Sequence, residues 1–190
     1  MYLRRKSSGF TIVELLIVIV VIGILAAIVV VAYNGITKSA QATSIVSEMR
    51  QWNKLFELYK AKYGELPRPS ATPTTGGGPG PLADDAYCLG TGFPIHNGTA
   101  YCYAYNNAQY LVEESRGATL LAELSKVGKP PQNSTKYIYG SVVGPLLRWY
   151  SDSDIRLYGI FIEGTVCADM GLGNGYTGWG RQECFIRLNQ

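Results

Sequence analysis

The sequence predicts an α+β protein in which a long N-terminal helix packs on a small antiparallel β-sheet head. Three observations support this prediction. Residues 15–32 form an uncharged apolar run, apolar side chains at helical spacing follow over residues 45–63, and short alternating segments occur after residue 64. The first half of the helix is therefore expected to span a membrane, and the second half is expected to be amphipathic.

The apolar run is long enough to cross a bilayer. At 1.5 Å per residue it extends roughly 27 Å, which is close to the thickness of a hydrocarbon core. Glu14 lies at its N-terminal edge, where a charge within hydrocarbon costs on the order of 3 kcal/mol. A secretory signal peptide is one alternative, although the run is longer than the apolar region of such a peptide. An ordinary membrane anchor is another, in which Glu14 reaches the interface.

Three basic residues, Arg4, Arg5 and Lys6, precede the apolar run. Basic residues beside a membrane helix mark the end that stays in the cytoplasm, so these three are expected to set the membrane orientation with the N-terminus inside. They are three of 17 basic residues, which leaves 14 against 14 acidic ones in the rest of the chain. This balance does not indicate a nucleic-acid-binding protein.

The order of the first residues suggests a purpose for Glu14. Cleavage after Gly9 would create a positive amine on Phe10, one helical turn before this carboxylate. In a bundle of such helices, Glu14 of one subunit would pair with the Phe10 amine of a neighbour. Leaving either charge unpaired in an apolar core would cost about 3–5 kcal/mol, so the pair would set the axial register of the bundle.

The segment "GFTIVELLIVIVVIGILAAI" resembles the cleavage signal and N-terminal helix of type IV pilins and pseudopilins. The resemblance implies that the prepilin peptidase cuts between Gly9 and Phe10, that Phe10 becomes N-methylated, and that Glu14 serves assembly. It implies a helical homo-oligomeric filament that includes other pilins. Further implied partners are membrane lipid before assembly, an assembly platform and its ATPase. The chain would cross the cytoplasmic membrane once before cleavage and join an extracellular filament afterwards.

One departure from the family concerns the end of the apolar run. Many type IV pilins have a proline there, whereas this chain has Val31 and no proline before Pro67. Gly23 weakens the helix by roughly 1 kcal/mol relative to alanine. Whether the helix melts between Gly23 and Val31 stays open at this point.

The second half of the helix is predicted from a stripe of apolar and aromatic residues. Such a stripe is typical of a helix packed on a core rather than of a cofactor site. Its members are Ile45, Met49, Trp52, Phe56, Tyr59 and Tyr63. The opposite, polar face is expected to carry Lys38, Gln41, Ser44, Glu48, Lys54, Glu57 and Lys62. Gly64, soon followed by a proline, is expected to end a helix of about 50 residues.

The head is expected to begin with a loop rich in proline and glycine at 67–82. Strands are predicted at "AYCYAY", "LLRWYS", "IRLYGIFIE" and "ECFIRLN", and a short helix is predicted at 118–127. The segments "KYIYGSVV" and "TVCAD" are expected to be extended, and "MGLGNGYTGWGRQ" is expected to be a loop. These segments predict one antiparallel sheet of about four or five strands against the amphipathic half of the helix.

The four cysteines, Cys88, Cys102, Cys167 and Cys184, all follow the apolar run. Their spacing matches no CxxC pattern and His96 is the single histidine, so neither a metal site nor a cofactor is expected. An even number of cysteines beyond a membrane segment favours two disulfides, with buried free thiols as the alternative. Of the three pairings we favour Cys88–Cys102 and Cys167–Cys184, each stabilising its loop by about 3 kcal/mol.

The expected organisation is a leader at 1–9, a hydrophobic segment at 10–33, an amphipathic continuation of the helix at 34–66 and a head at 67–190. Catalysis is not expected, because no recognisable nucleophile motif surrounds His96. The main hypothesis is a structural subunit of a type IV pilus, serving adhesion, twitching motility or DNA uptake. The alternatives are a pseudopilin of a secretion or competence system and a membrane-anchored extracellular binding module that never polymerises.

Overall fold

The computed structural model describes residues 9–69, 86–96, 98–105, 110–132, 136–138, 141–162, 164–178 and 181–188. The chain divides into two compact units, Met1–Ala40 and Gln41–Gln190. Arg4, Arg5, Lys6 and most of the loop expected at 67–82 lie outside the described residues.

A single helix, α1 (Ile12–Tyr63), contains residues of both units and is 52 residues long. The predicted length is therefore confirmed, and α1 stays helical from Gly23 to Val31. It is the one helix among the described residues that is long and apolar enough to cross a membrane, with a mean hydropathy of 3.6 over 18 residues. Gly64 follows with a φ of 84°, a left-handed conformation that suits glycine and ends the helix.

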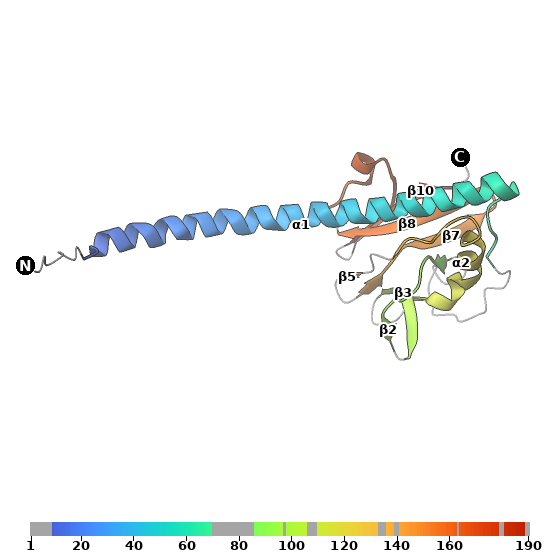
Figure 1. Ribbon diagram of the computed structural model, residues 1–190, viewed down its shortest axis with the longest axis horizontal. Helices are drawn as coiled ribbons and strands as arrows, with labels where there is room; N and C mark the ends of the chain where they lie inside the picture. The colour runs from blue at the N-terminus through green and yellow to red at the C-terminus, as the bar shows by residue number, and fades with distance from the viewer. Residues whose placement is uncertain are drawn as a thin grey trace, which may run out of the picture. The chain divides into compact units, whose positions relative to one another are not determined.

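The second half of α1 packs on the head through the predicted stripe (Figure 1). Met49, Trp52 and Phe56 are buried there, whereas Tyr63 at its end is 45% exposed. Glu48 was expected on the polar face, and this prediction is wrong because its exposed fraction is only 5%. The buried stripe is wider than predicted, since Leu55, one heptad after Glu48, also joins the core.

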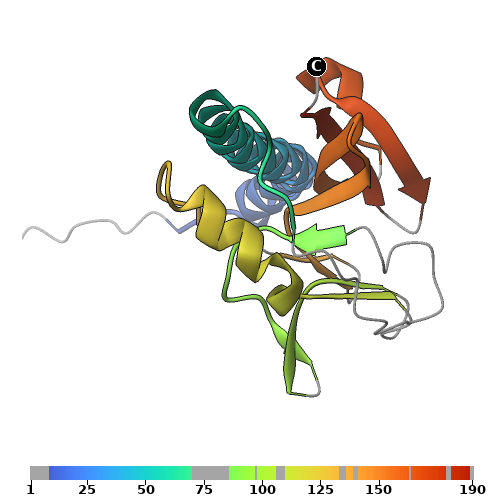
Figure 2. The same ribbon diagram turned by 90° about the vertical axis from the view of Figure 1, so that its right-hand side faces the viewer.

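The first sheet is antiparallel and lies against α1, which covers one of its faces in Figure 2. Its strand order is β1 (Ala86–Cys88), β7 (Leu146–Ser151), β8 (Asp154–Ile162), β10 (Arg181–Arg187) and β9 (Gly173–Gly178). Leu147, Ile155 and Leu157 share the core with the apolar stripe of α1. Because side chains alternate between the two faces along β7 and β8, the residues next to these three in the sequence lie on the opposite face of the sheet.

A second sheet was not predicted. It consists of β2 (Ile95–His96), β3 (Thr99–Tyr105), β6 (Ser141–Val143), β5 (Lys136–Ile138) and β4 (Tyr110–Glu113), which pairs with β3. The prediction of a single sheet is wrong because most of these strands are too short to show alternation. A second buried cluster joins β3 to the face of the first sheet that is turned away from α1, and includes Tyr103, Leu146 and Tyr158.

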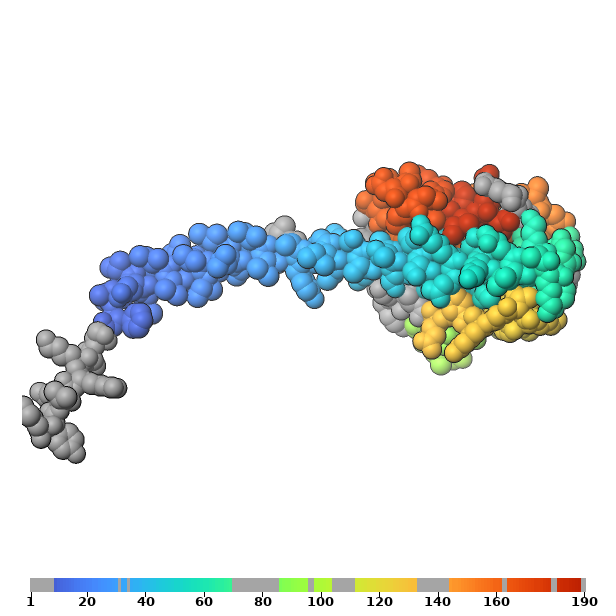
Figure 3. All heavy atoms as spheres, turned by 45° about the horizontal axis from the view of Figure 1, so that its top comes forward, coloured from blue at the N-terminus to red at the C-terminus, as the bar shows by residue number. Residues whose placement is uncertain are grey.

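The described residues of the head also form three short helical segments: η1 (Glu114–Gly117), α2 (Ala118–Leu124) and η2 (Cys167–Met170). On the face shown in Figure 3, α1 lies between the yellow segment that contains α2 and the red C-terminal strands. The helix predicted at 118–127 ends early, because the amide groups of Lys126 and Val127 bond in tight turns to Glu123 and Leu124. The segment "TVCAD", predicted to be extended, contains the first three residues of η2, and the predicted glycine-rich loop contains β9.

Candidate functional site

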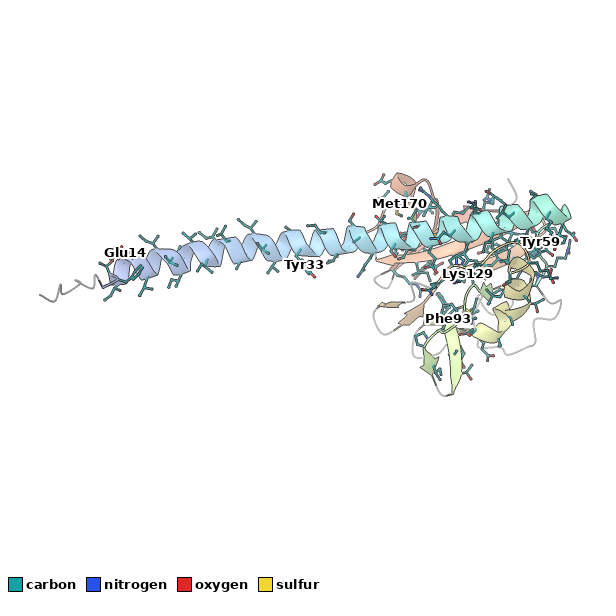
Figure 4. All side chains as sticks on the ribbon, viewed as in Figure 1. Glu14, Tyr33, Tyr59, Phe93, Lys129 and Met170 are labelled. Atoms are coloured by element: carbon teal, nitrogen blue, oxygen red, sulfur yellow. A yellow bond between two sulfur atoms is a disulfide. The ribbon has the colours of Figure 1, made fainter. Side chains whose placement is uncertain are left out.

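The start of α1 holds a reciprocal set of hydrogen bonds between Thr11 and Glu14, the residue labelled there in Figure 4. The backbone N–H of Thr11 donates to Glu14 Oε2 at 2.9 Å, and Thr11 Oγ1 donates to the same oxygen at 2.7 Å. The backbone N–H of Glu14 donates to Thr11 Oγ1 at 3.3 Å. This is a capping box, in which a threonine before the helix and a glutamate three residues later satisfy each other's backbone donors.

The capping box gives the Glu14 carboxylate hydrogen-bond partners within its own chain. A carboxylate in the first turn is also favoured by the helix dipole, whose N-terminal end is positive. The cost of placing this charge beside an apolar run is therefore partly offset before any other subunit is involved. Sequence reasoning missed Thr11, although the pattern "TIVE" has the spacing of a capping box.

The expected cleavage bond lies directly before this cap. Gly9, Phe10 and Thr11 are not helical, and the side chain of Phe10 is 82% exposed. The structure thus brings Gly9, Phe10 and Glu14 together at the start of α1. In this arrangement a new amine on Phe10 would form one residue before Thr11, whose own N–H already binds Glu14.

Two disulfides stabilise the head, and both join cysteines in the favoured pairing. Cys88–Cys102 connects β1 of the first sheet to β3 of the second. Cys167–Cys184 connects η2 to β10. All four cysteines are buried, so each bond contributes to the packing between elements as well as closing a loop.

The ionisable groups of the head form local pairs. Tyr59 donates a hydrogen bond to Glu123 at 2.7 Å, which raises the pKa of Tyr59 to about 12 and links α1 to α2. Burial raises the pKa of Glu183, although Arg181 lies 3.5 Å away and opposes the shift. Among the described residues, no three His, Cys, Asp or Glu side chains group so that they could hold a metal ion.

An apolar N-terminal helix whose first turn holds the glutamate of a capping box, and which continues into an α+β head, defines a pilin-like arrangement. Residues 4–30 match the family described as the prokaryotic N-terminal methylation motif. The resemblance of this segment to type IV pilins and pseudopilins is therefore confirmed.

Similar proteins include both filament and secretion components. Type II secretion system core protein G of Aeromonas hydrophila is 34% identical over 64 residues, covering 34% of this chain and 45% of that protein. Fimbrial protein Q of Moraxella bovis is 51% identical over 45 residues, covering 24% and 29%. Type IV major fimbrial protein FimA of Dichelobacter nodosus is 36% identical over 74 residues, covering 39% and 45%. The chain thus spans less than half the length of these relatives, and no solved structure gives a significant match.

Proposed function

We propose that this chain is the structural subunit of a type IV pilus filament, assembled after removal of residues 1–9. The observation that carries the proposal is the capping-box glutamate Glu14 at the start of an apolar helix, within residues 4–30, which match the prokaryotic N-terminal methylation motif. The role is structural rather than catalytic. Two disulfides and two cores support a head rigid enough to be carried on a filament.

Before assembly, residues 10–33 anchor the subunit in the cytoplasmic membrane, with Arg4, Arg5 and Lys6 on the inner side. Moving this helix from lipid into a bundle of like helices replaces one apolar environment by another, so the hydrophobic effect gives little net drive. Packing between helices, neutralisation of Glu14 and work by an ATPase at the assembly platform supply the drive instead.

The prepilin peptidase prepares this neutralisation by cutting between Gly9 and Phe10. The new Phe10 amine is a cation, so its hydrogen bond to the Glu14 carboxylate joins two charged groups, whereas each bond from Thr11 has charge on the acceptor alone. During assembly Glu14 exchanges some of its bonds to Thr11 for the amine of a neighbouring subunit. The capping box protects the carboxylate in the membrane, and the exchange sets the axial register in the filament.

The test compares Glu14→Gln with Glu57→Gln, an exposed glutamate of the same helix that bonds Asn53. Glutamine keeps the shape of Glu14 but removes the charge that would pair with the amine. We expect Glu14→Gln to abolish surface filaments while the disulfide-bonded head accumulates in the membrane at the normal level. Glu57→Gln should assemble normally. Wild-type filament yield from Glu14→Gln would refute the proposed pairing.

A pseudopilin is the second candidate, favoured by the similarity to type II secretion system core protein G. Deleting the gene in the producing cell separates the two. Loss of surface filaments with normal protein secretion supports the pilus subunit. Loss of secretion with filaments intact assigns the chain to a secretion system.

A further inference from the structure

Tyr59 and Tyr63 lie one helical turn apart at the end of α1, where Tyr59 is labelled in Figure 4. Their ring centroids are 4.4 Å apart and their planes are inclined by 39°, so the two rings are in contact. Tyr59 is buried in the core, whereas Tyr63 is 45% exposed. A reagent in solvent therefore meets the ring of Tyr63, and the ring contact connects Tyr63 to the buried Tyr59.

The hydroxyl of Tyr59 has a proton acceptor. It donates to Glu123 Oε2 at 2.7 Å, and Glu123 Oε1 accepts a hydrogen bond from Lys126 Nζ at 2.6 Å. A phenol that loses an electron becomes a strong acid, so a tyrosine gives up an electron more easily when a base at hydrogen-bond distance accepts its proton. The Glu123 side chain is 28% exposed, so a proton accepted there can pass to solvent. Tyr59 is therefore arranged to lose an electron and a proton together.

The ring of Tyr63 has a cation beside it. Lys62 Nζ lies 5.1 Å from the centroid of the Tyr63 ring. A cation is attracted to the electron-rich face of an aromatic ring, and it opposes the removal of an electron from that ring. An electron taken from Tyr63 is therefore replaced by one from Tyr59, whose proton goes to Glu123. The exposed tyrosine meets the oxidant, and the buried tyrosine supplies the first electron.

We propose that Tyr59 and Tyr63 form an oxidative modification site, at which a peroxidase and hydrogen peroxide join the two rings as dityrosine within one chain. Each tyrosine loses one electron and one proton, the proton of Tyr59 going to Glu123 and that of Tyr63 to solvent. The two radicals couple through ring carbons next to the hydroxyl-bearing carbons, and the hydrogens displaced from these ring carbons restore the two hydroxyls. One peroxide molecule takes up the two electrons and two protons and becomes two water molecules.

The product would be a covalent bridge across the last turn of α1, directly before Gly64 ends the helix. Because Tyr59 bonds Glu123, the bridge would also fix this turn beside α2. The proposal does not depend on filament assembly, since all the residues that carry it belong to the second unit.

Peptide mapping tests the proposal on the full chain in detergent micelles, treated with a peroxidase and hydrogen peroxide. Trypsin cuts after Lys60 and Lys62, which separates Tyr59 from Tyr63. The crosslink should therefore join two tryptic peptides of the monomeric chain, with a mass lower than their sum by two hydrogen atoms, and should give dityrosine fluorescence. Absence of this joined peptide, or dityrosine found only in covalent dimers, would overturn the proposal.

Two tyrosine variants locate the crosslink. Tyr63→Phe changes an exposed residue and should abolish the joined peptide and its fluorescence. Tyr150→Phe is the matched control, since Tyr150 is 43% exposed and its hydroxyl also meets a second tyrosine, Tyr158, at 3.1 Å. It should form the joined peptide in wild-type yield. Equal dityrosine fluorescence from Tyr63→Phe and the wild type would show that the radicals couple elsewhere and would refute the site. Equal unfolding midpoints confirm that both variants keep the fold.

The role of the proton acceptor is tested with Glu123→Gln. Glutamine still accepts a hydrogen bond from Tyr59 but is a far weaker base, so the joined peptide should form more slowly by about fivefold or more. Glu57→Gln, which changes an exposed glutamate on α1, should leave the rate unchanged. Equal rates for the two variants would show that Glu123 does not take the proton and would overturn the proposed order of electron loss.

Discussion

The close approach of α1 to β8 depends on the absence of a side chain at Gly159. A Cβ atom built there would lie 2.3 Å from Met49 Sδ and 2.9 Å from Ile45 Cγ2, both shorter than van der Waals contact. Gly159→Ala therefore forces the helix or its side chains to shift, and overpacking of this kind costs typically about 1–3 kcal/mol. We expect a loss of about 2 kcal/mol in the free energy of unfolding of the head.

A double-mutant cycle with Met49→Ala tests this explanation. Met49→Ala alone should cost about 2–5 kcal/mol, because it leaves a cavity in the core. In the double variant the new methyl group occupies part of that cavity, so the combined loss should be smaller than the sum by about 1 kcal/mol or more. The free energy of unfolding is measured by urea titration of the full chain in detergent micelles, for the wild type, the two single variants and the double variant. Tryptophan fluorescence follows the unfolding, because Trp52 is buried in this contact region.

Gly35→Ala is the control, since a Cβ there meets no atom within 4 Å. It should not lower the unfolding midpoint of the head, because alanine favours a helix more than glycine does. Strictly additive losses for Gly159→Ala and Met49→Ala would refute the reasoning, because they would show that the two positions do not share one packing contact.

Three further predictions concern the head. Arg156 holds the pKa of Asp154 below its usual value of 3.8, so Asp154→Asn should lower the unfolding free energy at pH 7, and urea titrations should show this difference shrinking as the pH falls below about 4. Glu123→Gln should lower the pKa of Tyr59 from about 12 toward 10, as measured by NMR of the labelled tyrosine ring. The cysteines of the two disulfides are separated by 14 and 17 positions in the sequence. Reducing each bond should lower the free energy of unfolding by about 3 kcal/mol, as measured by calorimetry under reducing conditions.

The long helix was predictable because one helical period continues across its second half and its first half is uniformly apolar. The boundary between the buried face and the polar face of this helix was harder to predict, as Glu48 shows, because burial depends on how wide a stripe of the helix the sheet covers. The second sheet could not be predicted, since β2 has only two residues and its register comes from pairing with β3. Local patterns identify single elements, whereas the pairing of distant strands depends on packing.

The same distinction between local pattern and packing applies to the candidate site. Gly9, Phe10 and Glu14 follow from a local motif, and Thr11 could have been found from the spacing of a capping box. The arrangement of the arginines on the first sheet could not have been found in this way, because Arg148 and Arg187 become neighbours of Arg156 only through strand register. Residues that a sheet gathers from separate strands give no periodic signal in the sequence.

The most direct test of the central claim is mass spectrometry of the N-terminal peptide from filaments sheared off the producing cells. Filament assembly after cleavage predicts a peptide that begins at Phe10 and is heavier by one methyl group. Uncleaved chain found only in the membrane fraction, with its leader still attached, would contradict the account. In that case Glu14 would never meet a neighbour's amine, and its bonds to Thr11 would be those of an ordinary helix cap.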